Sequence, residues 1–289
     1  MTSAIITGIT VGLLYGLMGF AIVALFKMTG VANFAAGTTA TLGATLALKL
    51  SDQANLNALA ASALAILLTA GAGLMAYLLV MRVRDDVDHL SLTVRTVGLF
   101  LLGQALLEIW LGQGQPFAFG SVLPDISTTA AGLAIPSSTL WFPLVAVAVI
   151  GAFGLIFSHT RIGLLMRGLA ADADTAGLLG ARTRLLAAVA WSLSSGLAAV
   201  VGILAAPSRL ISSDMMTSWL LYVFAGVVIG GMTSLAGAVI GGVGVGLVQG
   251  VTYQLASDEV ALLAVFAVFL LTLLVRPHGL FGAMVGERL

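Results

Sequence analysis

The sequence predicts an all-α protein that crosses a membrane many times, and three observations lead to this fold class. Only 8% of the 289 residues are charged, whereas a soluble domain has about 25%. The chain is 60% hydrophobic, with a mean hydropathy of +1.13. Its apolar runs are about twenty residues long, which fits membrane helices rather than the shorter strands of a barrel. We therefore expect a polytopic integral membrane protein with about eight to nine transmembrane or re-entrant helices.

The polar breaks between these runs are short, so we expect residues 1–289 to form a single transmembrane domain without a separate aqueous one. The sequence has no cysteine, which excludes disulfides and thiolate metal sites, and its net charge of zero argues against nucleic acid. It lacks the sequence motifs of metalloproteases, serine hydrolases and phosphate-binding loops. We expect no catalytic residue and no metal site in this chain.

The first predicted span covers residues 4–26. It carries a stripe of small residues that would let another helix approach closely, namely Gly8, Gly12, Gly16 and Gly19. Lys27 is expected to end this span. Residues 30–39, which pair glycine with threonine, then interrupt the apolar pattern before a second helix that ends near Leu48.

Later apolar runs predict the remaining spans, with a long loop over residues 112–139 that contains three prolines and a single charge. The predicted spans are 56–80, 92–111, 140–157, 185–205, 219–229, 238–255 and 260–275. A second interruption, at residues 230–237, again combines glycine with hydroxyl side chains.

The largest polar stretch, residues 161–184, holds four of the twelve Lys and Arg residues and must lie in water on one side of the membrane. If that side is the cytoplasm, ten of the twelve basic residues are cytoplasmic, as the positive-inside rule requires. These ten are Lys27, Arg82, Arg84, Arg95, Arg161, Arg167, Arg182, Arg184, Arg276 and Arg288, and the two outside are Lys49 and Arg209. The N-terminus is then outside and the C-terminus in the cytoplasm.

The two interruptions occupy corresponding places in the first and last thirds of the chain, which points to a transport path. An amide, hydroxyls and freed backbone groups there could meet a zwitterion, with an aromatic ring as an apolar wall. The candidate path residues are Asn33, Phe34, Gly37, Thr38, Gly231, Ser234 and Gly237. The alternative is structural: the polar residues only cap helix ends, and the glycines only admit neighbouring backbones.

The predicted spans lack the paired charges that ion-coupled carriers commonly place near span centres, and the chain has no nucleotide-binding motif. Glu108, the acid closest to a span interior, is interpreted as a residue of the outer rim. A transporter of this kind is either passive or receives its energy from another protein.

The polar stretch contains a spaced pattern of six residues: Arg161, Gly163, Arg167, Asp172, Ala176 and Gly180. This pattern resembles the cytoplasmic coupling segment of permeases in the branched-chain amino-acid ABC importer family, the LivH type. Three further stretches agree with that family in the same order: Gly12-x-x-Tyr15-x-Leu17 with Asn33-Phe34-Ala35-x-Gly37, then Gly230-Gly231-x-x-Ser234-x-x-Gly237-Ala238-x-x-Gly241-Gly242, and finally Arg276-Pro277-x-Gly279-Leu280.

The resemblance implies a type II importer-like permease in a bacterial plasma (inner) membrane. Its partners would be a second permease subunit (a related chain or a copy of itself), two cytoplasmic ATPases and an extracytoplasmic solute-binding protein. ATP and Mg would bind the ATPases, with no cofactor on this chain. The solute would be a branched-chain amino acid or a related small polar compound such as urea, an amide or an aromatic acid.

The resemblance also implies that residues 159–184 form a coupling segment that fits a groove on an ATPase. The chain departs from the family pattern at Ala36, Leu164 and Ala171, where polar or charged residues are usual. Two other functions stay open at this point. A passive channel for a small neutral solute would need no ATPase contact, and a non-transporting membrane scaffold would not need the interruptions.

Overall fold

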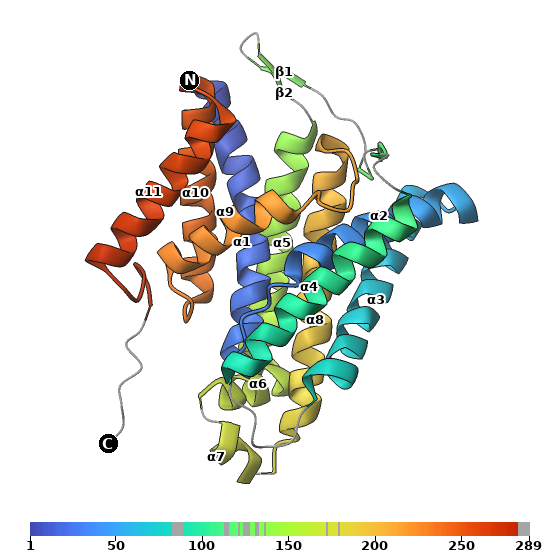
Figure 1. Ribbon diagram of the computed structural model, residues 1–289, viewed down its shortest axis with the longest axis vertical. Coiled ribbons are helices and arrows are strands. Elements are labelled where there is room, and N and C mark those ends of the chain that lie inside the picture. The colour runs from blue at the N-terminus through green and yellow to red at the C-terminus, as the bar shows by residue number, and fades with distance from the viewer. Residues whose placement is uncertain are drawn as a thin grey trace. The chain divides into compact units, whose positions relative to one another are not determined.

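The computed structural model describes residues 1–82, 89–112, 116–120, 122–123, 128–130, 133–135, 137–171, 173–178 and 180–282. The regular elements among these residues are helices, apart from one antiparallel pair of short strands (Figure 1). The elements are α1 (Thr2–Thr29), α2 (Ala36–Ala54), α3 (Ala58–Ala76), a π-helical turn η1 (Tyr77–Met81), α4 (His89–Leu111), β1 (Thr128–Ala130), β2 (Leu133–Ile135), α5 (Ser137–His159), α6 (Arg161–Ala171), α7 (Ala173–Leu178), α8 (Thr183–Ala205), a 3-10 turn η2 (Ala206–Ser208), α9 (Thr217–Gly230), α10 (Leu235–Leu255) and α11 (Asp258–Val275).

Seven of the described helices are long and apolar enough to cross a membrane. They are α1, α3 with η1, α4, α5, α8 with η2, α10 and α11. The apolar helix α9 has 14 residues and is shorter than a full span, and α2 has 19 residues with a more polar composition. Helices dominate because a chain in lipid must satisfy its backbone hydrogen bonds internally. The predicted polytopic helical fold is confirmed.

The first interruption is shorter than the sequence suggested, because α2 begins at Ala36, inside the predicted interruption of residues 30–39. Both neighbouring helices also end later than predicted. Helix α1 continues past Lys27 to Thr29, and α2 continues past Leu48 to Ala54. A half-buried lysine can keep its charge in water while its stem lies in the helix, so it need not end the span. The non-helical stretch is therefore residues 30–35.

The strands β1 and β2 lie in the loop for which the sequence suggested no regular structure. They pair in antiparallel register, with Thr128 opposite Ile135. Three prolines in the loop had hidden this short pairing, since proline is unusual in strands.

The helices group into two compact units, each described here by itself. Unit 1 comprises Met1–Val23, Asp125–Val147 and Trp219–Leu289, and unit 2 comprises Ala24–Pro124 and Ala148–Ser218. Helices α1, α5 and α9 begin in one unit and end in the other. That the whole chain acts as a single permease domain stays a prediction.

In unit 1, the glycine stripe of α1 packs against glycines and small residues of α10. A Cβ atom built on Gly12 would lie 2.8 Å from Cα of Val243, and one on Gly250 would lie 2.9 Å from Cα of Gly8. A Cβ on Gly246 would likewise overlap the backbone of Gly12. Both helices thus need glycine at their contact, as in close helix pairs in membranes. The prediction of a packing face on α1 is confirmed.

Unit 1 also contains a buried aromatic cluster around Tyr15 of α1. The Tyr15 hydroxyl donates to Oε1 of Gln249 on α10 at 2.7 Å. Its ring stacks on Tyr222 at 5.7 Å and meets Trp219 edge-on at 5.1 Å between centroids. The buried hydroxyl has its partner, so Tyr15 joins α1, α9 and α10 without an unpaired polar group.

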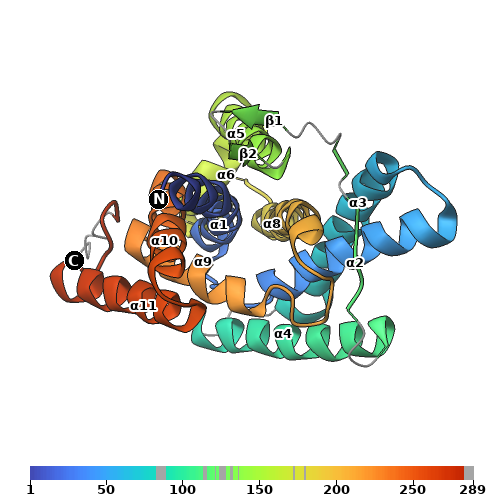
Figure 2. The same ribbon diagram turned by 90° about the horizontal axis from the view of Figure 1, so that it is seen from above.

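In unit 2, α2 lies among α3, α4 and α8, and the top view shows it between them (Figure 2). Small residues allow this close packing. A Cβ on Gly43 of α2 would overlap Ala199 of α8, and one on Gly202 would overlap the backbone of Ala40. The buried threonines of α2 donate to carbonyls of the preceding turn, for example Thr45 to Thr41 at 2.9 Å. A helix rich in hydroxyls can therefore be buried in this unit.

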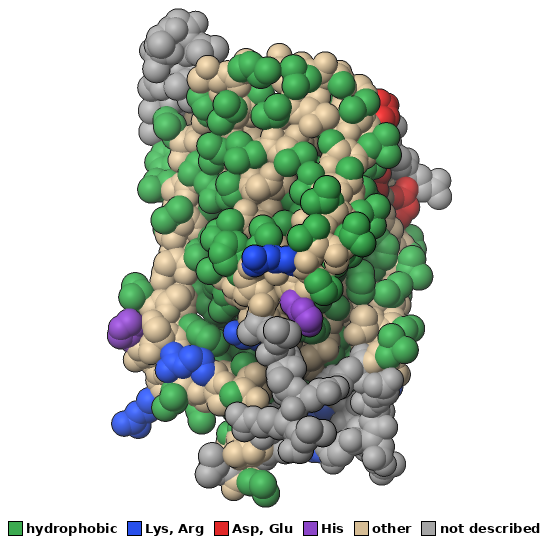
Figure 3. Space-filling view, turned by 90° about the vertical axis from the view of Figure 1, so that its left-hand side faces the viewer, with side chains coloured by type: hydrophobic (Ala, Val, Ile, Leu, Met, Phe, Trp, Pro, Cys, Tyr) green, Lys and Arg blue, Asp and Glu red, His purple; other side chains and the backbone are tan. Residues whose placement is uncertain are grey.

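The surface agrees with a protein in lipid. On the face drawn in Figure 3, hydrophobic side chains cover much of the area, whereas Lys, Arg and His side chains are seen from the middle of the view downward. Exposed leucines are numerous on α3, α4 and α11. Such faces would be costly in water and are normal against acyl chains.

Candidate functional site

The first interruption, residues 30–35, is held in shape by hydrogen bonds of its own side chains. Asn33 is buried, and its Oδ1 accepts a hydrogen bond from the backbone N–H of Ala35 at 3.0 Å. The Thr38 hydroxyl donates to the carbonyl oxygen of Ala35 at 2.9 Å. Gly37 is buried and Phe34 is half-buried. The structure thus brings Asn33, Phe34, Gly37 and Thr38 together at the beginning of α2.

Thr96 of α4, which the sequence did not single out, holds this interruption in place through hydrogen bonds. Oγ1 of Thr96 accepts from the N–H of Phe34 at 3.2 Å and lies 2.9 Å from the carbonyl oxygen of Ala32. The same Oγ1 lies 2.7 Å from the carbonyl of Thr93 in its own helix. The Thr96 hydroxyl therefore bonds one N–H and one carbonyl that have no helical hydrogen bond because the helix is interrupted there. Because more than sixty residues separate the partners, no local pattern could have revealed this contact.

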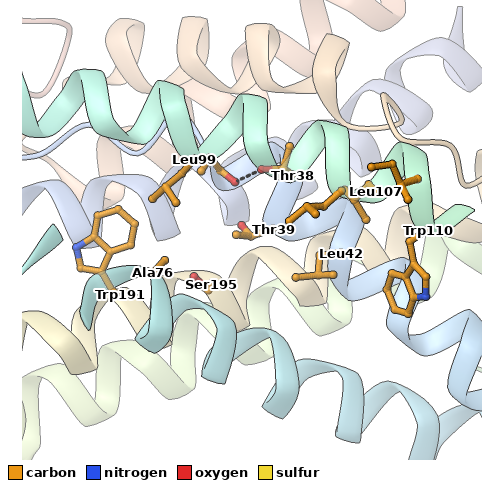
Figure 4. Close-up of a pocket in the computed structure, with 13 residues that line it drawn as sticks. Thr38, Thr39, Leu42, Ala76, Leu99, Leu107, Trp110, Trp191 and Ser195 are labelled. Atoms are coloured by element: carbon orange, nitrogen blue, oxygen red, sulfur yellow. Dashed lines mark hydrogen bonds between the residues drawn. The ribbon is translucent and has the colours of Figure 1, made fainter. Parts of the chain in front are cut away.

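Thr38 also lines a cavity of about 510 Å³ in unit 2 (Figure 4). This volume lies in the range of small-molecule sites. The walls come from α2, α3, α4 and α8 together with Ala35, which precedes α2. The lining residues are Ala35, Thr38, Thr39, Leu42, Ala76, Leu99, Gly103, Leu106, Leu107, Ile109, Trp110, Trp191 and Ser195.

The cavity is apolar, with three hydroxyls in its wall. The hydroxyls of Thr38 and Thr39 donate to carbonyls of the preceding turn at 2.9 Å each. Ser195 is 1% exposed, and its Oγ has no hydrogen-bond partner in the described part of the chain. Apart from Thr38, the sequence had suggested none of these residues, because they lie on four separate helices without a local polar pattern.

The second interruption lies in unit 1 between α9 and α10, and its residues have structural tasks. Ser234 caps α10, since its Oγ accepts from the N–H of Gly237 at 3.0 Å. A Cβ on Gly237 would overlap the carbonyl of Gly230. Gly231 has φ +107°, which disfavours any residue with a side chain. The capping alternative for these residues agrees with this geometry.

The C-terminal stretch after α11 folds back onto this interruption. The N–H groups of Leu280 and Phe281 donate to the carbonyls of Ile229 and Gly230 at 2.8 and 3.0 Å. Gly279 has φ +78°, and a Cβ there would lie 2.6 Å from Cα of Gly231. The Arg276-to-Leu280 motif therefore satisfies carbonyls at the end of α9 that no helix bond can reach.

The polar stretch forms two short helices, α6 and α7, outside the candidate spans. The motif residues of α6 turn toward the end of α5. A Cβ on Gly163 would overlap the carbonyls of Ile156 and Phe157. Arg167 donates to the carbonyl of Phe157, and its guanidinium lies 5.9 Å from the centre of that ring. Arg161, in contrast, is exposed at the first residue of α6.

The rest of the polar stretch also has an inner side, which packs against the protein, and an outer side, which is exposed. Ala176 of α7 is buried, and Gly180 forms the turn before α8 with φ +88°. Asp172 lies outside the described residues. The outer side of α6 and α7 carries the motif residue Arg161 and three leucines: Leu164, Leu165 and Leu178 are 61%, 46% and 90% exposed.

Each end of unit 2 has a pocket, and different segments line the two pockets. At one end, a pocket of about 210 Å³ is lined by residues of α6, the end of α1, the turn η1 and the beginnings of α4 and α8. Its residues include Met28, Thr29, Met81, Leu92, Leu169, Thr183 and Arg184.

At the opposite end of unit 2, where α4 ends, the charged residues include Glu108, Asp214 and Lys49, whereas the first pocket contains Arg184. Oε2 of Glu108 accepts a hydrogen bond from Ser213, and both line a polar pocket of about 530 Å³ with Asp214. The ammonium of Lys49 lies 5.1 Å from the ring centre of Phe117. This placement agrees with the interpretation of Glu108 as a rim residue.

Comparisons with known proteins give relatives of nearly the same length. The permease protein BraD of the high-affinity branched-chain amino acid transport system of Pseudomonas aeruginosa is 25% identical over 96% of this chain and 94% of its own. The probable branched-chain amino acid transport permease protein LivH of Methanocaldococcus jannaschii is 28% identical over 88% of this chain and 84% of its own.

One solved structure, PsaBC from Streptococcus pneumoniae in complex with Fab, superposes with a TM-score of 0.49 at 16% identity, over 95% of this chain and 91% of that one. A likeness this weak carries no argument about function. The family match is of a different kind. Residues 4–274 match the family described as branched-chain amino acid transport system / permease component. Because this match spans nearly the whole sequence, the chain belongs to the permease component family of branched-chain amino acid transport systems.

Proposed function

We propose that this chain is the permease subunit of an ATP-binding cassette importer. It forms a membrane path for branched-chain amino acids, or a related small polar solute such as urea, an amide or an aromatic acid, by ATP-driven alternating access. The observation that carries the proposal is the family match over residues 4–274. A passive channel is not favoured, because the relatives are named as components of transport systems. Energy and solute capture then require partners: two ATPases that bind ATP and Mg, a second permease subunit and a solute-binding protein.

The proposed path runs past the two interruptions. In unit 2 it uses Asn33, Phe34, Gly37 and Thr38, and in unit 1 it uses Gly231, Ser234 and Gly237. Irregular backbone at membrane depth is tolerated where protein covers it or where it lines a cavity. Asn33, Thr38 and Ser234 hold their polar side chains against neighbouring backbone. A passing solute would replace these hydrogen bonds with its own. The interruptions would then change shape whenever the solute binds.

The proposed orientation places the N-terminus outside and the C-terminus in the cytoplasm of a bacterial plasma membrane. Its support is the positive-inside rule. Within unit 2, Arg184 lines the pocket that also joins the end of α1 to the beginning of α4. Arg95 donates to the carbonyl of Val80 at 3.0 Å near the same end. Lys49 and Glu108 lie at the other end.

The proposed ATPase contact is the outer side of α6 and α7, with Leu164, Leu165 and Leu178 as its apolar part. These leucines are exposed outside the candidate spans, where acyl chains would not cover them. The motif residues Gly163 and Arg167 lie against α5 and would give the segment its shape. This division explains why an acid or base at position 164 is not required: the contact would be apolar rather than ionic.

A capture experiment tests the proposal. The tagged chain is solubilised from its native membrane, and the wild type is compared with a Leu164→Asp, Leu178→Asp double variant. Ala171→Asp serves as the control, because it places a charge on the exposed end of α6 without removing a leucine. We expect two ATPase subunits and a second permease with the wild type and the control, and loss of the ATPases with the double variant.

Capture of the chain alone would count against the importer and bring back the passive channel. Capture of the same ATPases by all three proteins would keep the importer but remove the leucines from the contact.

A further inference from the structure

Thr38 is the one residue that the cavity of about 510 Å³ in unit 2 shares with the proposed solute path, among the residues that the structure describes. The shape, the opening and the chemistry of the cavity point to an occupant other than the solute. We propose that this cavity holds an acyl chain of a membrane lipid. The inference does not depend on the importer function.

The cavity is elongated along the helices. In Figure 4 the indoles of Trp191 and Trp110 lie at opposite ends of the lining residues, with Thr39 and Leu42 between them. Its wall on α4 extends from Leu99 to Trp110, which is about 16 Å at 1.5 Å per residue. A space that extends along a membrane helix in this way suits a hydrocarbon chain better than a compact solute.

The cavity reaches a surface that faces outward from unit 2. On its α4 wall, Leu106 is 56% exposed and Ile109 is 78% exposed. The inner wall, in contrast, consists of buried residues of α2 and α8, including Thr38 and Ser195. A chain could therefore enter sideways from the bilayer, past α4, without crossing a polar region.

The chemistry of the wall excludes a zwitterion. The lining residues include no Asp, Glu, Lys, Arg or His in the part of the chain that the structure describes. An amino acid that left water for this site would lose hydration at two charges without gaining an ion pair. Thr38 and Thr39 already donate their hydroxyl protons, so only Ser195 has an unused hydroxyl. A methylene chain needs no partner and would fill the space with van der Waals contacts.

Trp191 is the natural reporter, because it lines the cavity and yet is only 2% exposed. The other three tryptophans, residues 110, 141 and 219, are replaced by Phe, and the chain is reconstituted in vesicles of phosphatidylcholine with brominated acyl chains. Bromine quenches an indole only at close range. We expect strong quenching of Trp191 relative to vesicles of the ordinary lipid.

A second single-tryptophan protein that keeps only Trp219 is the control. Trp219 is 3% exposed and does not line this cavity, so its fluorescence should be nearly unchanged in the brominated lipid. An unquenched Trp191 in folded protein would overturn the proposal. Trp191 also lines the pocket of about 210 Å³, so acrylamide could reach it from there. Acrylamide quenching that Ala76→Phe abolishes would overturn the proposal, since the cavity itself would then hold water or solute.

A filling variant separates entry into the cavity from contact at the outer surface. Ala76→Phe places a ring in the cavity, whereas Leu79→Phe adds one at a position 76% exposed, three residues further along. We expect Ala76→Phe to abolish the quenching of Trp191 and Leu79→Phe to preserve it. Equal quenching in both would contradict the proposal.

Mass spectrometry of the otherwise wild-type protein, released from detergent, gives a second readout that needs no tryptophan replacement. The expected result is a retained phospholipid that Ala76→Phe loses and Leu79→Phe keeps. A phospholipid count that Ala76→Phe leaves unchanged would contradict the proposal.

Discussion

At the scale of single residues, the motif of the polar stretch serves the shape of α6 and α7. Arg167 was a candidate for the ATPase surface, but its guanidinium caps the carbonyl of Phe157 and covers that ring. Gly163 lets α6 begin directly against the end of α5, where the Thr160 hydroxyl oxygen accepts from the Gly163 N–H at 3.0 Å. Spacing along the sequence predicted a coupling segment, but spacing does not say which side of a helix faces the protein.

Gly163 and Gly168 provide a matched test of this role. Gly163→Ala should lower stability by about 1–3 kcal/mol, because its Cβ would overlap two carbonyls of α5. Gly168→Ala on the same helix meets nothing within 4 Å and should be neutral or stabilising by up to about 1 kcal/mol. Thermal unfolding in detergent, with limited proteolysis of residues 160–182, measures both. Equal stability of the two variants would show that α6 does not pack closely on α5.

Thr96 provides a residue-scale test of the first interruption. Thr96→Val keeps the shape but removes the oxygen that the N–H of Phe34 uses, which should cost about 1–3 kcal/mol. Thr96→Ser retains the hydroxyl and should stay close to the wild type. The free energy of unfolding and the rate of solute uptake are measured for both. A fully stable and active Thr96→Val protein would mean that the interruption is fastened by other contacts.

At the scale of elements, two non-helical stretches of unit 1 stabilise each other. The C-terminal stretch donates from Leu280 and Phe281 to the last carbonyls of α9. Both stretches were visible in the sequence as motifs, but their contact was not. The contact joins backbone atoms of residues about fifty positions apart. Backbone hydrogen bonds do not depend on side-chain type, so the sequence pattern does not reveal them.

Leu280 allows this contact to be tested at one position. Leu280→Pro removes the N–H that the Ile229 carbonyl accepts and should destabilise unit 1 by about 1–3 kcal/mol. Leu280→Ala keeps the N–H and removes a side chain that is half exposed, so its effect should be small. The comparison is made by thermal unfolding in detergent. A similar loss for Pro and Ala would assign the effect to the side chain instead.

The contact between α1 and α10 is the second element-scale feature. Gly246→Val should prevent close packing, because even a Cβ there overlaps the backbone of Gly12. Gly244→Val lies two residues away, meets nothing within 4 Å and should be neutral or slightly stabilising, because valine has a higher helix propensity than glycine. Yield of monodisperse protein in size-exclusion chromatography reports the result. Monodisperse Gly246→Val protein would show that the two helices can separate without loss of the fold.

At the scale of the whole molecule, the apolar runs predicted the helical membrane fold, because bilayer thickness fixes the length of a span. The cavity could not be predicted. Thr38 approaches Gly103 of α4, with 3.1 Å from a Cβ built on the glycine to Thr38 Oγ1, and Ser195 reaches the same space from α8. Span lengths set the number of helices, but the neighbours of each helix depend on tertiary packing.

For the whole molecule, the proposal of an ATP-driven path can be tested directly against a passive pore. The complex captured by the tagged chain is reconstituted in vesicles with its solute-binding protein. Uptake of labelled leucine is then followed with ATP and Mg on the ATPase side. We expect uptake that requires ATP, stops with a non-hydrolysable analogue and is absent for the chain alone. Equilibration of leucine or another small solute through the isolated chain, without ATP, would contradict it.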